Sequence, residues 1–453
     1  MTAVMLFSLS GCSFRFSSFE DLLRPPKLTG KYQDLQKSFE KSAGSDYILR
    51  PPDNGDFQSA FITYDCDADG DEDAIVFYSD RKAPSTVKML YFNYDDGKWN
   101  SGGSFEGSGS SVDLVMFPDI DNDGNPEILV GWSVLSDKIN KTFTLYGTDN
   151  NKAVLIKAYP YTYVSCFDVN GDGVDDIFSL TVDSSVPELP TGYARVYNFS
   201  SQDKTLNILS ETRTDGNISS YTSVNTENAE DFNYIYVEAT KGDHDSITEL
   251  IYWDDETNSL VSPFFDTETQ TTKLTWRNMQ ISCFDIDGDG FLEIPTSVEM
   301  KGSFSSVTKP ANSTNKDVNV KNDETESMYF IKWVKYRDGY ARPVQYSVYN
   351  ESGYLLNIHS SWVGRITAIK TDGQMDFYRW ATSTEEMGDL LFSLCTYDST
   401  VESSRKMYSS YKKLKSSGNT NFAYSITDEG YDFGVNETNI EEGFMLTDFG
   451  GQK

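Results

Sequence analysis

The sequence predicts an all-β fold, a β-propeller of six or seven four-stranded blades with calcium loops and a short N-terminal helix. Three observations indicate this fold. An acidic loop motif occurs four times in the 453 residues, a β-rich segment follows every copy, and the spacing of the copies repeats. Four strands in roughly 50–60 residues are typical of one propeller blade.

The loop motif is clearest in residues 285–293, which read Asp-Ile-Asp-Gly-Asp-Gly-Phe-Leu-Glu. Oxygen-bearing side chains at loop positions 1, 3, 5 and 9 can surround one Ca²⁺, and a glycine at position 6 permits a left-handed turn. The four sets at positions 1, 3, 5 and 9 are Asp65, Asp67, Asp69 and Asp73; Asp119, Asp121, Asp123 and Glu127; Asp168, Asn170, Asp172 and Asp176; and Asp285, Asp287, Asp289 and Glu293. The glycines at position 6 are Gly70, Gly124, Gly173 and Gly290.

The residues after position 9 indicate which kind of calcium loop this is. An EF-hand needs a glutamate at position 12 and a helix after it. The segments that follow the four loops are instead rich in β-branched and aromatic residues, which predicts strands. Position 12 is occupied by Val76, Val130, Ser179 and Thr296. We therefore expect loops that connect two strands, not EF-hands.

The spacing of the loops predicts a hidden repeat. The first aspartates stand at positions 65, 119, 168 and 285, so the last step is about twice the length of the others. Residues 223–231 fall where a further copy is expected, and a strand-like run over 232–237 follows them. They lack the glycine and the first acid of the motif. We expect a degenerate repeat without metal there.

The charge and the histidine count exclude several classes of function. There are 38 basic and 70 acidic residues, a net charge of −32, which argues against nucleic acid and anionic lipid as partners. His244 and His359 are the two histidines of the sequence. Two histidines argue strongly against a His-rich metal site, and a Ser-His-Asp or Cys-His mechanism would need one of the two. We expect His244 in a solvated turn and His359 as an ordinary polar residue.

Residues 1–12 resemble a bacterial lipoprotein signal peptide. An apolar run leads to Leu9-Ser10-Gly11-Cys12, so Cys12 is the expected lipidated residue and the protein is expected outside the cytoplasm on a lipid anchor. The run is too short to span a bilayer and lacks basic residues at its start, so a start further upstream or an accidental resemblance stays open. Residues 13–55 are expected to form a tether and a short amphipathic helix over 31–43.

Residues 56–445 are assigned to the propeller, with calcium-loop blades over 56–300 and degenerate blades to about 445. The polar residues 301–326 predict a long loop. Thr371-Asp372-Gly373 predicts a turn that is too short for the calcium motif. Further strands are expected over 329–333, 345–349, 365–369, 377–380, 391–395 and 422–426.

Two acidic pairs follow similar aromatic runs. Asp95-Asp96 ends the run over 89–94, and Asp254-Asp255 ends the run over 250–253. Their recurrence at one repeat position predicts hairpin turns, and the alternative is a pair of glycosidase carboxylates. Buried thiols rather than disulfides are expected at Cys66, Cys166, Cys283 and Cys395.

The four loops resemble the FG-GAP/VCBS-type repeats of the integrin α-subunit propeller and of many bacterial surface proteins. The Asp-x-Asp/Asn-x-Asp-Gly-x-x-Asp/Glu pattern matches at 65–73, 119–127, 168–176 and 285–293, whereas the Phe-Gly and Gly-Ala-Pro signatures are not evident. The direct match covers about residues 60–300. The resemblance implies that the four side chains and the backbone carbonyl at position 7 bind Ca²⁺. These carbonyls belong to Asp71, Asn125, Val174 and Phe291.

The four calcium ions are expected to be structural, because clustered carboxylates repel one another without a cation. We therefore expect a monomeric, lipid-anchored, extracytoplasmic module that binds a protein or glycan of the cell envelope or surface and catalyses nothing. A propeller hydrolase or lyase that acts on polysaccharide is the alternative. The sequence contains no Gly-x-Ser-x-Gly, P-loop or His-Glu-x-x-His motif, which favours the binding module.

Overall fold

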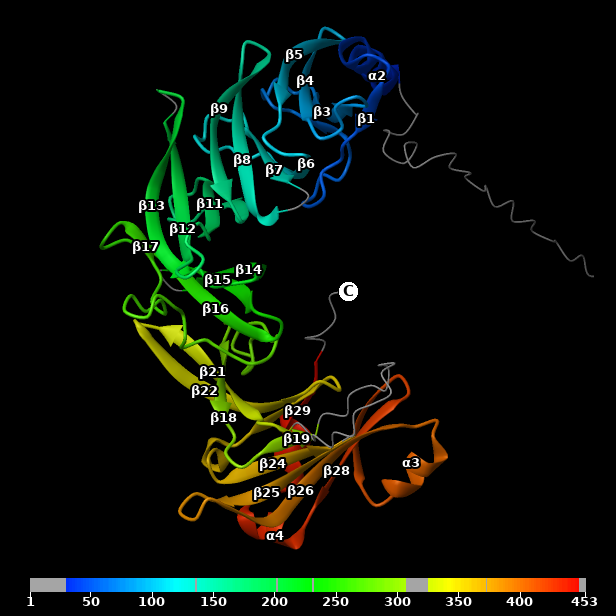
Figure 1. Ribbon diagram of the computed structural model, residues 1–453, viewed down its shortest axis with the longest axis vertical. Helices are drawn as coiled ribbons and strands as arrows, with labels where there is room; N and C mark the ends of the chain where they lie inside the picture. The colour runs from blue at the N-terminus through cyan, green and yellow to red at the C-terminus, as the bar shows by residue number, and fades with distance from the viewer. Residues whose placement is uncertain are drawn as a thin grey trace, which may run out of the picture. The chain divides into compact units, whose positions relative to one another are not determined.

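The computed structural model describes residues 30–134, 137–200, 203–229, 232–306, 325–371 and 373–447. In these ranges the chain is all-β, with six sheets that are antiparallel except for one short parallel pair (Figure 1). The chain divides into two compact units, residues 1–216 with 252–261 and residues 217–251 with 262–453. The prediction of an all-β protein with four-stranded antiparallel sheets is confirmed, and no closed ring of sheets is shown by the described residues.

The first sheet of unit 1 carries the N-terminal helix on one face. Its elements are α2 (Gly30–Ala43), β1 (Tyr47–Leu49), β2 (Phe61–Tyr64), β3 (Asp73–Asp80), β4 (Val87–Asp95) and β5 (Lys98–Glu106). The strand order is β1-β3-β4-β5, and β2 also pairs with β3. Helix α2 lies beside β3 and β5 of this sheet (Figure 1). Its Leu35 and Phe39 are fully buried in one core with Val76 and Trp99 of the sheet. The helix predicted over 31–43 is confirmed.

Two regular four-stranded sheets follow in unit 1. Their strands are β6 (Ser111–Met116), β7 (Ile128–Val134), β8 (Asp137–Asp149) and β9 (Lys152–Tyr161), then β10 (Tyr163–Phe167), β11 (Asp176–Asp183), β12 (Thr191–Ser200) and β13 (Thr205–Asp215). Each sheet keeps the order of the sequence. Phe77 of the first sheet meets Trp132 of the second at 5.9 Å between ring centroids, and Phe143 of the second meets Tyr197 of the third at 5.6 Å. Successive sheets thus pack through shared cores.

The hidden repeat forms a fourth sheet, at the point where the chain passes between the units. Its strands are β14 (Ser220–Ala229), β15 (Phe232–Lys241), β16 (Asp245–Asp254) and β17 (Ser259–Val261). The prediction of a repeat here is confirmed, but the expected degenerate loop over 223–231 is wrong for residues 223–229, which lie in β14. Val224 pairs there with Val237. Without the glycine and the first acid, this segment extends as a strand with β-branched residues.

Unit 2 contains two larger sheets. The first has the order β18-β21-β22-β23-β29 and the second β20-β19-β24-β25-β26-β28-β27. Their strands are β18 (Ile294–Glu299), β19 (Phe304–Ser306), β20 (Thr325–Glu326), β21 (Tyr329–Arg337), β22 (Tyr340–Asn350), β23 (Tyr354–Ile358), β24 (Ile366–Thr371), β25 (Gln374–Ala381), β26 (Glu386–Asp398), β27 (Lys412–Ser417), β28 (Thr420–Ile426) and β29 (Phe444–Leu446). The six strands predicted after residue 328 are confirmed as β21, β22, β24, β25, β26 and β28. Their predicted starts were inexact, because β22, β25, β26 and β28 begin two to five residues earlier than expected.

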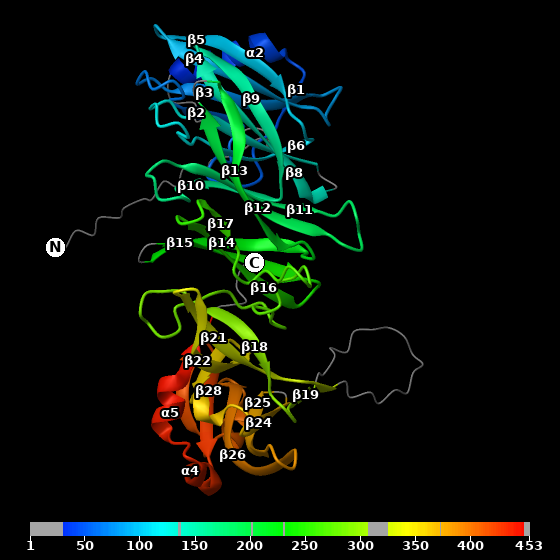
Figure 2. The same ribbon diagram turned by 90° about the vertical axis from the view of Figure 1, so that its left-hand side faces the viewer.

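Short helices near the C-terminus were not predicted. They are the single turn η1 (Ser360–Trp362), α3 (Glu402–Met407), α4 (Asp428–Phe433) and α5 (Glu437–Gly443). The Thr427 side chain caps α4, and Asn436 and Asn439 form a capping box at α5. Helix α4 lies beside β26 (Figure 2). Ile440 of α5 and Phe444 are buried in the same core as Leu391 of β26. None of the described helices combines the length and apolar character that crossing a bilayer requires.

Several predictions fall outside the described residues. They concern the signal peptide over 1–12 with Cys12, the tether residues 13–29, residues 307–324 of the predicted long loop, and Asp372 of the predicted short turn.

Candidate metal centre

The four acidic loops all lie directly before a strand. Loop 65–73 joins β2 to β3, loop 119–127 lies between β6 and β7, and loop 168–176 joins β10 to β11. Loop 285–293 leads into β18, and its ends are joined by a bridge between Phe284 and Glu293. Position 12 of each loop lies within β3, β7, β11 or β18, and no helix follows. The prediction of strand–loop–strand motifs is confirmed for the first three loops, and the fourth differs in that a single bridge residue, Phe284, precedes it. The absence of a following helix within the described residues agrees with the prediction that these are not EF-hands.

The backbone makes the same turn in all four loops. The glycine at position 6 has a positive φ in each, as predicted: 93° at Gly70, 88° at Gly124, 87° at Gly173 and 90° at Gly290. Position 4 also has a positive φ, which the sequence analysis missed: 53° at Ala68, 54° at Asn122, 78° at Gly171 and 77° at Gly288. Glycine or asparagine at position 4 of three loops was a readable signal, because these residues tolerate the left-handed region best.

Backbone amides hold the carboxylates of positions 1 and 5 in place. The amide of position 6 donates to the position-1 carboxylate, with N–O distances of 3.0 Å at Asp65, 3.0 Å at Asp119, 2.9 Å at Asp168 and 2.9 Å at Asp285. The amide of position 7 donates to the position-5 carboxylate, at 2.8 Å for Asp69, 2.7 Å for Asp123, 2.9 Å for Asp172 and 3.1 Å for Asp289. The two carboxylates are therefore oriented before any ligand arrives.

The position-9 acid is buried in every loop. It accepts the amide of position 2, at 3.3 Å for Asp73, 3.2 Å for Glu127, 3.1 Å for Asp176 and 2.9 Å for Glu293. Burial, ahead of repulsion from neighbouring aspartates, raises the pKa of Glu127 to about 8 and the pKa values of Asp73 and Asp176 to about 6. Burial also raises the pKa of Glu293. Such groups are costly to ionise without a cation beside them.

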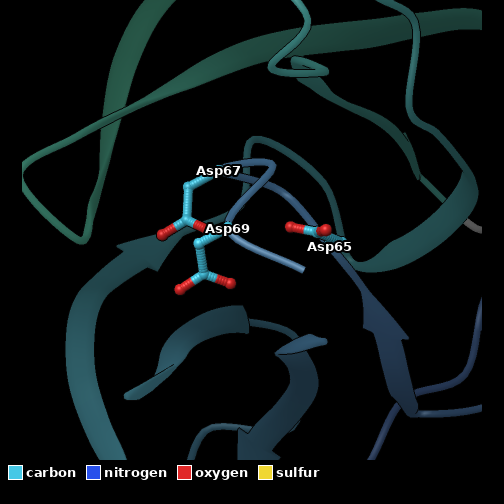
Figure 3. Close-up of side chains that lie close together, drawn as sticks. All are labelled: Asp65, Asp67 and Asp69. Carbon is cyan, nitrogen blue, oxygen red and sulfur yellow. The ribbon is translucent and has the colours of Figure 1, made fainter. Parts of the chain in front are cut away.

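The carboxylates converge as a cation site requires. In the first loop, Asp65, Asp67 and Asp69 offer oxygen atoms within 4.8 Å of one another, and Figure 3 shows the Asp65 carboxylate turned toward the other two. Asp119, Asp121 and Glu127 form an equivalent group, as do Asp285, Asp287 and Asp289. The Oδ1 atoms of Asp65 and Asp67 are buried and accept no hydrogen bond from the part of the chain that the structure describes. Converging hard oxygen atoms, some without a hydrogen-bond donor, fit Ca²⁺.

The third loop shares the backbone arrangement but has an amide at position 3. Asn170 accepts the amide of Asp172 at 2.9 Å, so its side-chain oxygen is oriented like the aspartates at position 3. The converging acids of the first, second and fourth loops can thus hold a metal ion, and calcium in the third loop stays a prediction. The backbone carbonyls of Asp71, Asn125, Val174 and Phe291 stay predicted ligands.

The left-handed backbone at position 4 leads to a prediction for stability. Ala68 has a φ of 53°, and a left-handed conformation costs a non-glycine residue about 1–2 kcal/mol. Part of this is offset by the greater freedom of glycine in the unfolded chain. We expect Ala68→Gly to raise the free energy of unfolding by up to about 1 kcal/mol in urea denaturation. Asn122→Gly is the matched control, with a smaller expected change because asparagine tolerates this region. Destabilisation by Ala68→Gly would contradict the assignment.

The other candidate residues lie in ordinary surroundings. His244 is exposed in the turn before β16. His359 is exposed, and its Nδ1 accepts the amide of Ser361 at 3.2 Å. Asp95 and Asp254 end β4 and β16, so the predicted hairpin turns are confirmed. The four cysteines are free thiols, as predicted. The prediction that they are buried is confirmed for Cys66, Cys283 and Cys395, whereas Cys166 is half-buried.

Comparison with known proteins gives no family. No protein-family model matches the chain, and no curated protein matches it. The solved structures that are similar include the exotype rhamnogalacturonan lyase YesX, with 10% identity, 45% of this chain and 53% of that chain covered, and a TM-score of 0.23. The rhamnogalacturonan lyase YesW matches with 11% identity over 54% of this chain and 58% of that chain, at a TM-score of 0.27. Sqt1 of Saccharomyces cerevisiae matches with 9% identity over 73% of this chain and 86% of that chain, at a TM-score of 0.29. The chain spans little more than half the length of the two lyases, and TM-scores this low assign neither fold nor function.

Proposed function

We propose that this protein is a calcium-stabilised β-propeller of the FG-GAP/VCBS type that acts as a non-catalytic binding module. We further propose that it is a monomer held at an extracytoplasmic membrane surface through lipid on Cys12. The observation that carries the proposal is the fourfold recurrence of one loop. Each copy has the same hydrogen bonds, the same left-handed turns and a buried acid at position 9.

The repeated sheets support the propeller. Three sheets of unit 1 follow one another in sequence order, and neighbours share buried cores. In each of them the acidic loop connects two paired antiparallel strands, β2 and β3, β6 and β7, or β10 and β11, which is the relation expected of equivalent blades. Calcium at these positions would tie the ends of two strands together. Extracellular calcium at millimolar concentration suffices for loops of modest affinity, which agrees with an extracytoplasmic location.

An aromatic cluster beside two of the loops supports a binding role. Tyr64, which is 36% exposed, immediately precedes the first loop and stacks on Phe117 at 4.0 Å with an interplanar angle of 2°. Phe57 packs edge-on against both rings. An exposed ring that its neighbours hold in place offers apolar area at little cost in conformational entropy. The apolar faces of a glycan ring are suitable ligands for such a surface, so a glycan of the cell envelope is the favoured partner.

The proposal is tested by measuring binding and turnover on the same polysaccharides. Purified protein is incubated with envelope polysaccharides in the presence of Ca²⁺, while calorimetry follows binding and size-exclusion chromatography follows the length of the polysaccharide. We expect binding without shortening. Tyr64→Ala should weaken binding by about tenfold, or about 1.4 kcal/mol, whereas Tyr340→Ala, which truncates another exposed tyrosine, should not. Shortened or unsaturated products would instead favour the hydrolase or lyase.

A further inference from the structure

The four loops differ at one place that the strand register makes comparable. In each sheet, the position-9 acid faces one residue of the next strand. The residue after position 9 is paired with the next strand in all four sheets. These pairs are Ala74 with Phe92, Ile128 with Tyr146, Ile177 with Tyr197, and Ile294 with Val334. The residues opposite position 9 are therefore Asn93, Gly147, Asn198 and Lys335. Three of these are uncharged, and the fourth carries an ammonium group.

The Lys335 ammonium enters the 285–293 loop. Its Nζ lies 3.0 Å from the buried Oε1 of Glu293 and 3.4 Å from Oδ2 of Asp287, and it is also paired with Asp289. One cation thus contacts the acids at positions 3, 5 and 9, which are three of the side chains expected to bind calcium. The Lys335 side chain is only 15% exposed, so the ammonium is enclosed by the loop.

The first loop shows what stands at this place when lysine is absent. The Asn93 side chain there donates to Oδ2 of Asp67 at 2.9 Å and to Oδ1 of Asp73 at 3.0 Å, the acids at positions 3 and 9. It brings no charge, and the Oδ1 atoms of Asp65 and Asp67 accept no hydrogen bond from the described residues. In the fourth loop, Oε1 of Glu293 also accepts no hydrogen bond of good geometry, but the Lys335 ammonium lies 3.0 Å from it as an ion-pair partner. Lys335 makes the equivalent contacts in the fourth loop and neutralises part of the negative charge as well.

Further contacts hold the fourth loop around the lysine. Arg337, two residues along β21, pairs with Glu227 of β14, and Glu227 also accepts the amide of Leu292 at 2.6 Å. The guanidinium of Arg337 lies 4.5 Å from the centre of the Phe291 ring, and the Lys335 Nζ lies 5.8 Å from the same centre. A divalent ion that entered here would displace the ammonium from its carboxylates or lie beside it, and the two cations would repel each other.

From these contacts we propose that Lys335 takes the place of calcium in the 285–293 loop, so that the protein binds calcium at three loops rather than four. The inference rests on the proposed function, because it presupposes calcium in the other loops. An internal ammonium makes this loop of unit 2 independent of the calcium concentration. The stability of unit 1, which contains the other three loops, depends on the calcium concentration.

The test is the number of calcium ions per chain, measured by elemental analysis after equilibrium dialysis against 1 mM Ca²⁺. We expect three ions in the wild-type protein and four in Lys335→Asn, which installs the residue found at the same place in the first loop. Asn93→Lys, the converse change, should bind two. Lys335→Arg keeps the charge and should stay at three. Lys332→Asn removes a lysine from the same strand and should also stay at three. Circular dichroism checks that each variant is folded.

The outcomes separate this inference from the proposed function. Absence of bound calcium from the wild-type protein would overturn both. Four ions in both the wild-type protein and Lys335→Asn would overturn the inference alone, and so would three ions in both. If Lys335→Asn does not fold, the Asn93→Lys variant still decides, because an unchanged count of three would show that a lysine at this place does not exclude calcium.

Discussion

Removal of calcium with EGTA is expected to lower the melting temperature by more than about 10 °C. A site that is saturated to about 100 times its dissociation constant stabilises a protein by about 2.7 kcal/mol. Three such sites would contribute roughly 8 kcal/mol. In a unit of about 200 residues, 1 kcal/mol shifts the melting temperature by about 2–4 °C. The shift should be measured by differential scanning calorimetry in 1 mM Ca²⁺ and then in excess EGTA.

The distribution of the loops gives this experiment an internal control. Loops 65–73, 119–127 and 168–176 belong to unit 1, and loop 285–293 with Lys335 belongs to unit 2. Heat absorption that arises from unit 1 should move to lower temperature in EGTA, and that of unit 2 should move much less. EGTA preloaded with Ca²⁺ should have no effect. An unchanged melting temperature would count decisively against metal in these loops.

A second large effect is expected from pH in the metal-free protein. The pKa of Glu127 is raised from 4.5 to about 8, and the pKa values of Asp73 and Asp176 are raised from 3.8 to about 6, in each case chiefly by burial. Between the unfolded and the folded pKa of each carboxyl, the folded protein therefore binds more protons than the unfolded chain. The free energy of unfolding falls as pH rises through that interval. Each carboxyl contributes about 1.4 kcal/mol per pH unit of its interval.

The pH profile has a predicted shape. In EGTA, the melting temperature should fall most steeply between about pH 5 and 6, where all three carboxyls contribute. It should fall less steeply between pH 6 and 8, where Glu127 is the one of these three carboxyls that still contributes. Saturating Ca²⁺ should remove the decline, because the metal stabilises the ionised carboxylates. Glu127→Gln, which carries no titrating group, should lose the decline between pH 6 and 8. A metal-free protein that becomes more stable from pH 5 to 8 would contradict these assignments.

Residues close together in the sequence were predicted well. The nine residues of each calcium loop contain both the acids and the glycine, so the motif defines the turn, and the following β-rich runs define the strands. Thr427 and Asn436, which cap α4 and α5, were also readable as helix starts. The helices were missed because six or seven residues are too few to show a helical period. In the hidden repeat, the loop was expected where the β-branched residues of β14 form a strand.

Contacts between distant residues could not be predicted. Lys335 follows Glu293 by 42 positions, across a polar segment, and nothing in the sequence gives the register of β18 on β21. Asn93 and Asp73 are related in the same way through β3 and β4. The motif alone therefore predicts four equivalent calcium sites. The strand register distinguishes the fourth loop, where a lysine contacts the acids, from the first, where an asparagine does.

A crystal structure of the protein grown in calcium, with data collected at a wavelength where calcium scatters anomalously, tests the central claim most directly. We predict anomalous peaks within the loops at 65–73, 119–127 and 168–176, each surrounded by the oxygen atoms of positions 1, 3, 5 and 9 and the carbonyl of position 7. At 285–293 we predict the Lys335 ammonium and no peak. Loops that hold only water in saturating calcium would contradict the account.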